Sequence, residues 1–285
     1  MTEQTGRYRA ILAAPQWTLG RLGAPLMRRW SGATYILAVI GAVFALAVRP
    51  SSWSAAVRSV LARQILFTGV EALSFALRIA AAVGVLLVVQ AELWLGGLGQ
   101  SELIGSLLLN VIVRELAPLL ANFVVIVRSG TAMATELASM RLEGEVEVLD
   151  AQGIDPMIYL VMPRVISTSV SVFCLAVTMV VACFVSGYVV GTLLGVINQD
   201  AVKFFGDMLG QVRAIDLLFF LPKTLLSGLF IGTICSVQGL SVRGAVTEVP
   251  QVAGRAAVTS LSVVFTVSAV LSLTIYGSVL FINVF

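Results

Sequence analysis

Two charged residues, Arg114 and Glu115, stand in the middle of an apolar stretch of this 285-residue chain. A charged side chain at the centre of a membrane helix costs ~2.5–3.5 kcal/mol on insertion scales, so such residues usually serve a function. The chemistry they predict is the binding and release of polar or charged groups. Arg128 follows Arg114 by about four helical turns, so we expect both side chains on one face.

Further charges interrupt the preceding apolar segment, Leu66–Leu95. Glu71 and Arg78 are two helical turns apart and would share a face. Two interpretations remain open for the charges at membrane depth. They form a polar pathway or coupling network inside the bundle, or they form internal ion pairs that fix the register of the helices.

The elements that carry these charges are membrane spans. The chain is 59% hydrophobic and 12% charged, whereas a soluble domain has about 25% charged residues. Basic residues sit at the ends of apolar segments, which excludes a nucleic-acid binder. Histidine is absent, which removes the commonest metal ligand and proton relay. Cys174, Cys183 and Cys235 lack ligand spacing, and we expect small core residues.

The predicted fold is an all-α polytopic membrane protein with an N-terminal interfacial helix and five spans. Ser31–Val48 is apolar, but basic residues flank both its ends, which favours an interfacial or re-entrant helix; a sixth span is the alternative. The connection around Asn198–Asp216 holds Lys203 and Arg213 beside three acids. Each full span needs about 20 apolar residues, and the five that qualify are Leu66–Leu95, Leu103–Val127, Val165–Ile197, Leu217–Val242 and Ala256–Phe285.

These spans form one membrane domain over residues 1–285. Residues 1–62 are a cytoplasmic and interfacial region, and residues 63–285 are the five-span bundle with a polar segment at 136–162. The distribution of Arg and Lys predicts a cytoplasmic N-terminus and a C-terminus on the far side of the membrane.

The segment between the second and third spans, Glu136–Met162, is acidic and rich in helix formers. Gly153 suits a helix C-terminus, and Asp155-Pro156 suits the start of another helix. We therefore expect two short cytoplasmic helices joined near Gly153, with an ordinary solvated loop as the alternative. An apolar stripe predicts a partner surface; it comprises Leu137, Met140, Leu142, Val146 and Leu149.

Gly187, Gly191 and Gly195 recur at every fourth residue, a spacing that lets helices approach closely. This face would serve packing inside the bundle or a dimer contact, and we favour internal packing. The chain contains no Gly-Lys-Ser or Gly-Lys-Thr, and hence no P-loop. No catalytic constellation and no metal site are recognisable, so we do not expect an enzyme.

The combined motifs resemble the MlaE/YrbE-type permeases, the membrane subunits of ABC transporters that work with MCE-domain proteins. The resemblance rests on long runs of matching residues: Arg114-Glu-Leu-Ala-Pro118, Arg128 through Met140, Val148 through Pro156, and Pro163-Arg164, with Arg63-Gln64, Gly69 and Gln90 upstream. Glu71 and Arg78 stand where the family usually has apolar residues.

The resemblance implies a homodimeric permease of the bacterial inner membrane, with a C-terminus in the periplasm. It implies a separate ABC ATPase, which binds ATP and Mg²⁺, and an MCE-domain periplasmic partner; this chain would bind no cofactor. The substrate would be phospholipid. The lipid pathway or polar network would comprise Gln90, Arg114, Glu115, Arg128, Glu71 and Arg78. The ATPase-coupling residues would be Glu136, Met140, Arg141, Glu143, Glu145, Asp150, Gly153, Asp155 and Pro156.

Two rival interpretations belong to other classes of protein. An ion-driven secondary transporter would use the carboxylates Glu71, Glu92 and Glu115. A membrane scaffold would anchor peripheral proteins through the acidic segment, but it would give no reason for charges at membrane depth.

Overall fold

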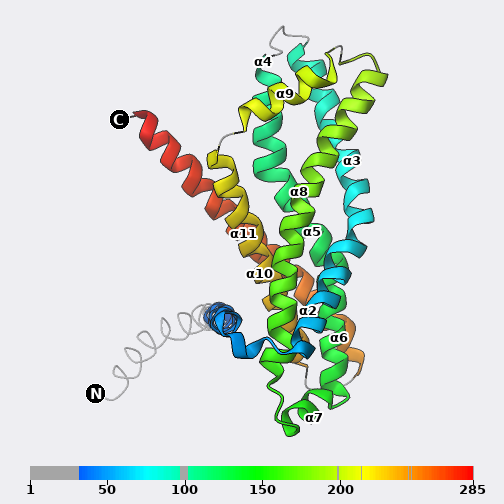
Figure 1. The fold of residues 1–285 in the computed structure, drawn as a ribbon, viewed down its shortest axis with the longest axis vertical. Helices are drawn as coiled ribbons and strands as arrows, with labels where there is room; N and C mark the ends of the chain where they lie inside the picture. The colour runs from blue at the N-terminus through cyan, green and yellow to red at the C-terminus, as the bar shows by residue number, and fades with distance from the viewer. Residues whose placement is uncertain are drawn as a thin grey trace, which may run out of the picture.

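The protein is an elongated helical bundle with α7 at one end and α9 at the other (Figure 1). This computed structural model describes residues 32–96, 102–197, 199–212, 214–242, 244 and 246–284, and every regular element in these ranges is helical. Within them, five continuous helical stretches are long and apolar enough to cross a membrane, as predicted. They are Ala55–Leu95, Leu109–Leu142, Met157–Leu193, Asp216–Leu240 and Val249–Thr274.

Short 3-10 and π-helical turns, labelled η, divide these stretches into shorter elements. In chain order the elements are η1 (Pro50–Ser52), α2 (Ala55–Ile65), η2 (Leu66–Val70), α3 (Glu71–Ala91), η3 (Glu92–Gly96), α4 (Glu102–Leu108), η4 (Leu109–Leu116), α5 (Ala117–Val124), η5 (Val125–Gly130), α6 (Thr131–Leu142), α7 (Glu145–Ala151), η6 (Met157–Val161), α8 (Met162–Leu193), α9 (Ala201–Gln211), α10 (Ala214–Leu240), η7 (Val246–Glu248) and α11 (Val249–Val284).

A separate apolar helix, Gly32–Val48, precedes these elements. Figure 1 shows it end on, beside the foot of α2, so it runs across the long axis that the spans follow. It buries Val39 and Val43 against the first turns of α8, while much of its remaining apolar surface is exposed. This orientation agrees with the interfacial helix and not with a sixth span. The basic residues before it lie outside the described residues.

The centre of the bundle is α8, which packs against α3 on one side and α10 on the other. The α3 face toward α8 carries small residues at every fourth position, namely Ala72, Ala76, Ala80 and Gly84. A Cβ on Gly84 would overlap the backbone of Cys183, and one on Gly187 would overlap the Val88 side chain. Gly187 therefore serves internal packing, as favoured from the sequence. Gly195 has a different role, because its φ of +70° ends α8.

The connection after α8 is partly helical. It contains the amphipathic helix α9, which buries Phe204 and Met208. The Phe204 ring lies 5.0 Å from that of Tyr188 on α8, and the Tyr188 hydroxyl donates to the Gln199 carbonyl at 3.1 Å. These contacts fold α9 over the end of the bundle.

The acidic segment at the opposite end has one more break than predicted. Gly144, with φ +78°, separates α6 from α7 in the stretch expected to be one helix. Gly153, with φ +76°, follows α7, as predicted. Asp155 caps the next helix, because its Oδ1 accepts the Met157 N–H at 2.8 Å. That helix is not a separate short one: it continues directly into α8.

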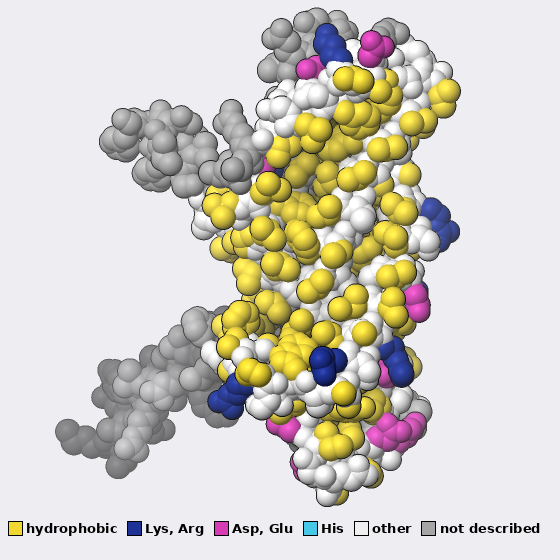
Figure 2. Space-filling view, viewed as in Figure 1, with side chains coloured by type: hydrophobic (Ala, Val, Ile, Leu, Met, Phe, Trp, Pro, Cys, Tyr) yellow, Lys and Arg dark blue, Asp and Glu magenta, His cyan; other side chains and the backbone are white. Residues whose placement is uncertain are grey.

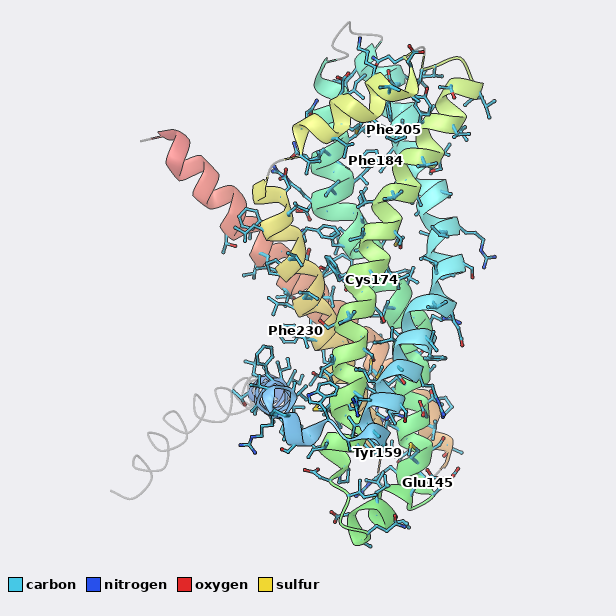
Figure 3. All side chains as sticks on the ribbon, viewed as in Figure 1. Glu145, Tyr159, Cys174, Phe184, Phe205 and Phe230 are labelled. Carbon is cyan, nitrogen blue, oxygen red and sulfur yellow. The ribbon has the colours of Figure 1, made fainter. Side chains whose placement is uncertain are left out.

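Two further expectations are wrong. Cys183 and Cys235 are buried, but Cys174 is exposed on α8 about midway along the bundle (Figure 3). The apolar stripe of the acidic segment is not a free surface for a partner protein. Leu137 and Val146 are buried within the molecule, and the other members of the stripe pack against the same cores.

Candidate functional site

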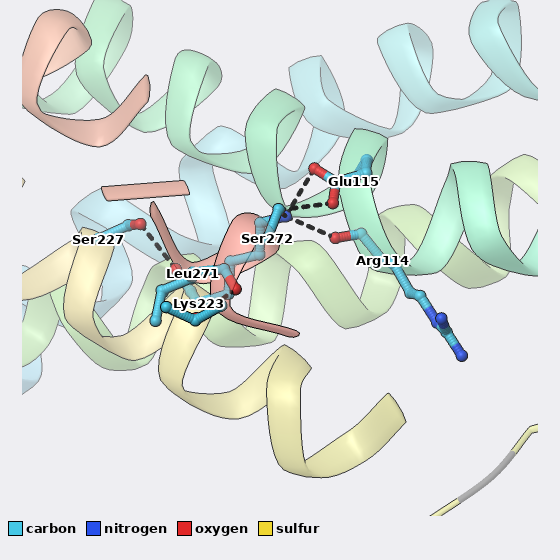
Figure 4. Close-up of polar contacts among 7 residues, drawn as sticks. Arg114, Glu115, Lys223, Ser227, Leu271 and Ser272 are labelled. Atoms are coloured by element: carbon cyan, nitrogen blue, oxygen red, sulfur yellow. Dashed lines mark hydrogen bonds and ion pairs between the residues drawn. The ribbon is translucent and has the colours of Figure 1, made fainter. Parts of the chain in front are cut away.

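A charged cluster joins three helical segments inside the bundle (Figure 4). Lys223 of α10 is 3% exposed. Its Nζ donates to Glu115 Oε2 at 2.7 Å, to the Arg114 carbonyl at 2.8 Å and to Ser272 Oγ at 2.9 Å. The Ser272 hydroxyl, on α11, donates in turn to Glu115 Oε1 at 2.7 Å. All three N–H groups of the ammonium therefore have an acceptor, as a buried charge requires.

The local sequence explains why a backbone carbonyl takes part. Pro118 lies four residues after Arg114 and has no N–H, so the usual helical donor to the Arg114 carbonyl is missing. The backbone is also widened here, because Arg114 and Glu115 lie in the π-helical turn η4. Lys223 supplies the donor that proline cannot, and this ties α10 to the second span.

Arg114 completes the cluster through an ion pair with Asp216, in the first turn of α10. The Asp216 side chain is 1% exposed, and that of Arg114 is 26% exposed. Two bases thus face two acids, and the cluster has no formal net charge. Removing any one of these four charges would leave its partner without a counter-charge.

The cluster encloses almost no space in this conformation. The cavity lined by its charged residues, Ser272 and Phe219 and Phe220 has a volume of about 20 Å³, enough for roughly one water molecule. A lipid headgroup does not fit between these side chains as they stand. The cluster therefore acts here as a clamp on the second, fourth and fifth spans.

Arg128 belongs to a different contact. Its guanidinium pairs with Glu71 of α3 at 3.1 Å, donates to the Phe67 carbonyl at 3.3 Å and lies 5.8 Å from the Phe67 ring centre. Arg114 and Arg128 do not share a face as predicted, because Arg114 contacts α10 whereas Arg128 contacts α3. Arg78 and Gln90, the other predicted pathway residues, are exposed on α3.

A third group of charges lies at the α7 end. The guanidinium of Arg164, which is 4% exposed, pairs with Glu136 at 2.8 Å and donates to the Leu160 carbonyl at 3.0 Å. Arg141 pairs with Glu147 across the Gly144 turn. These contacts fix α6, α7 and the start of α8 relative to one another.

The α7 end also presents an exposed acidic surface, which Figure 2 shows beyond the broad apolar surface of the bundle. Met140, Arg141 and Pro156 of the predicted coupling set are half-buried, and the remaining members are exposed. Those exposed members are Glu136, Glu143, Glu145, Asp150, Gly153 and Asp155. Val148 and Ile154 add exposed apolar area beside the acids.

Sequence reasoning missed three members of the charged cluster: Lys223, Asp216 and Ser272. Lys223 interrupts an apolar segment just as Arg114 and Glu115 do, so the same criterion would have found it. Asp216 lies at the edge of its span, so the sequence assigns it to the polar connection and not to the charges at membrane depth. Ser272 carries no signal in the sequence, because a serine in a membrane helix is common and bonds to its own backbone.

A bundle of five spans, with buried charge pairs and an exposed polar surface at one end, defines a polytopic membrane protein built for transport. The chain belongs to the MlaE permease family, whose family model matches residues 61–274. It is accordingly an ABC transporter permease, a class of subunit that is not itself the catalytic one, and the family implies an ATPase partner.

Individual relatives agree with this assignment. A probable ABC transporter permease of Rickettsia typhi is 29% identical over 181 residues, which cover 64% of this chain and 69% of the relative. A probable ABC transporter permease of Synechocystis is 30% identical over 186 residues, covering 65% and 70%. The chloroplastic protein trigalactosyldiacylglycerol 1 of Arabidopsis thaliana is 28% identical over 192 residues, covering 66% and 53%.

Proposed function

We propose that this permease moves phospholipid between the bacterial inner membrane and an MCE-domain partner in the periplasm. Two identical chains would enclose the lipid, and a separate ATPase, with ATP and Mg²⁺, would drive the cycle. The permease family supports the ATPase partner, and the lipid in the name of the Arabidopsis relative supports a lipid substrate.

The observation that carries the proposal is the charged cluster around Lys223. It holds a base and an acid from the second span against an acid and a base from the fourth. Parting those spans would expose both signs of charge at membrane depth, which suits a headgroup that carries a phosphate and a polar or cationic group. The closed clamp is then the resting state, and the open clamp is the state that admits lipid.

The proposed ATPase dock is the exposed surface of α6 and α7. Charged side chains there surround Val148, which is 54% exposed, and Ile154, which is 38% exposed. The Arg141–Glu147 and Arg164–Glu136 pairs connect the dock to the second and third spans. A displacement of α7 by the ATPase would therefore reach the second span, which is one of the three that hold the clamp.

The proposed orientation follows from the same surface. The α7 end faces the cytoplasm, where the ATPase and its nucleotide are, and the α9 end faces the periplasm. The C-terminal part of α11 runs toward the α9 half of the bundle (Figure 1).

Reconstitution tests the function directly. The permease, its ATPase and the MCE-domain protein are placed in liposomes with a fluorescent phospholipid, and ATP-dependent transfer to the MCE-domain protein is measured. Glu115→Ala should reduce transfer while the ATPase still co-purifies, because Glu115 lies in the clamp and not at the dock. Ser262→Ala is the matched control, since that hydroxyl bonds only its own helix, at the Val258 carbonyl. Normal transfer by Glu115→Ala would remove the clamp from the transport cycle.

A further inference from the structure

Arg78 is an exposed cation on the outer surface of the first span. Its neighbours Phe75 and Leu77 are also exposed, at 37% and 38%, and Leu86 further along α3 is 64% exposed. This is the composition of a surface that faces lipid tails. A charged group on such a surface requires a counter-charge or a hydrogen-bonding partner.

Arg78 lies near the middle of the membrane-spanning part of the bundle. Two contacts set the relative heights of α3 and α8: Gly69 abuts Ser171, and Gly84 abuts Cys183. Interpolating along the two helices places Arg78 level with about residue 178 of α8. That level is halfway along Met162–Leu193, and Figure 3 shows the nearby Cys174 midway along the bundle.

The nearest acid on the first span does not neutralise Arg78. Glu71, two turns closer to the α7 end, is already paired with Arg128. The Arg78 Nε donates to the Ser74 carbonyl at 3.1 Å, which draws the guanidinium toward the α7 end. Within the described part of the chain that carbonyl is the acceptor it contacts, and no carboxylate lies within ion-pair distance. The positive charge of the Arg78 guanidinium therefore requires an anion that the described residues do not supply.

A second copy of the chain does not supply that anion through the same face. A two-fold axis along the membrane normal keeps equal residues at equal heights, so a contact through this face places the Arg78 of the second copy at the same height and adds a like charge. Glu71 of the second copy would lie about 10 Å away along the helix and would already be paired. An anion that can move along the surface fits better than a fixed acid of this chain.

We propose that Arg78 binds the phosphate of a phospholipid from the leaflet on the α7 side. The headgroup is drawn below the usual interface along a polar strip on the outside of the first span, formed by Glu71, Ser74 and Arg78. The three side chains of this strip are exposed and lie three to four residues apart, so each helical turn of the strip carries a polar group. A phosphate that moves from the level of Glu71 to Arg78 therefore has a polar side chain beside it at every turn. This site is separate from the charged clamp and would exist even if the protein transported no lipid.

The experiment measures how deep headgroups reach beside α3. A fluorophore is attached at Leu77→Cys in a Cys174→Ser background, and the purified chain is placed in liposomes of phosphatidylcholine and phosphatidylglycerol. Quenching is compared for lipids that carry the quencher on the headgroup and lipids that carry it in mid-chain. With Arg78 present, headgroup quenchers reach the fluorophore despite its depth.

Arg78→Leu provides the critical comparison. It removes a charge from a lipid-facing surface, so folding is not endangered, and α-helix content and elution volume verify this. The mole fraction of headgroup-labelled lipid required for half-maximal quenching should rise roughly tenfold, since a charged hydrogen bond is worth at least that factor. Arg78→Lys should retain most of the quenching, because it keeps the cation.

Two outcomes overturn the proposal. Equal headgroup quenching in the Arg78→Leu variant means that Arg78 does not hold the phosphate. The second outcome combines two results: headgroup quenching is weak in liposomes, and a photocrosslinker at Leu77 captures a defined membrane protein in native membranes. The counter-charge of Arg78 would then be a carboxylate of that protein.

Discussion

Replacing Lys223 by methionine tests whether the charged cluster is a clamp. Methionine fills a similar volume but leaves Glu115 with Ser272 alone and the Arg114 carbonyl without its donor. Breaking a fully buried pair costs ~3–5 kcal/mol. The Glu115 side chain is 33% exposed, so we expect about 3 kcal/mol for Lys223→Met, at the lower end of that range. Glu115→Gln should cost a similar amount, because it leaves the buried ammonium without its counter-charge.

The two changes together should cost less than their sum. The double variant carries neither charge, so it should lose no more than roughly 4 kcal/mol instead of ~6, a coupling of about 2 kcal/mol. Denaturant unfolding of the chain in detergent micelles, followed by circular dichroism, gives the free energies. The Arg141–Glu147 pair is the control: its side chains are 38% and 54% exposed, and its coupling should stay below about 1 kcal/mol. Additive losses at Lys223 and Glu115 would refute the clamp.

Three further changes have distinct expected outcomes. Gly84→Ala should destabilise the fold by roughly 1–3 kcal/mol, because the added Cβ overlaps the α8 backbone. Gly41→Ala is the control and should not destabilise the fold, because the space around Gly41 is open. Thermal unfolding of the two variants compares their stabilities. Reversing the charge of Glu143 and Glu145 should lower the yield of co-purified ATPase without changing the stability of the chain, and an unchanged yield would argue against the dock. A reporter fused after Phe285 should be active only in the periplasm, and cytoplasmic activity would reverse the proposed orientation.

Much of the architecture could be predicted because bilayer physics leaves few choices. A run of about 20 apolar residues must form a helix, since lipid offers the backbone no other hydrogen bonds. The glycine at 153 and the Asp155-Pro156 pair likewise act locally, through left-handed backbone and helix capping. Such features depend on a few adjacent residues, and the structure has them where the sequence placed them.

The pairing of the charges was not predictable in the same way, because it depends on rotation about the helix axis. A regular α-helix would put Arg114 and Arg128 on one face. The π-helical turns at Leu109–Leu116 and Val125–Gly130 change that rotation, since each π turn accommodates an extra residue. Arg114 therefore reaches α10, whereas Arg128 reaches α3. No periodicity rule applied to the sequence reveals where such turns occur.

The strength of the clamp sets a requirement on whatever opens it. If Lys223 and Glu115 hold the closed state by their coupling of about 2 kcal/mol, the open state is populated at about one part in 30. A partner that binds both states equally leaves this ratio unchanged, however tightly it binds. An ATPase docked on α7 must therefore bind the open permease about 30-fold more tightly than the closed one before half of the molecules open. Weakening the clamp by Glu115→Gln should then raise the open fraction without the ATPase and lower the dependence of lipid access on nucleotide.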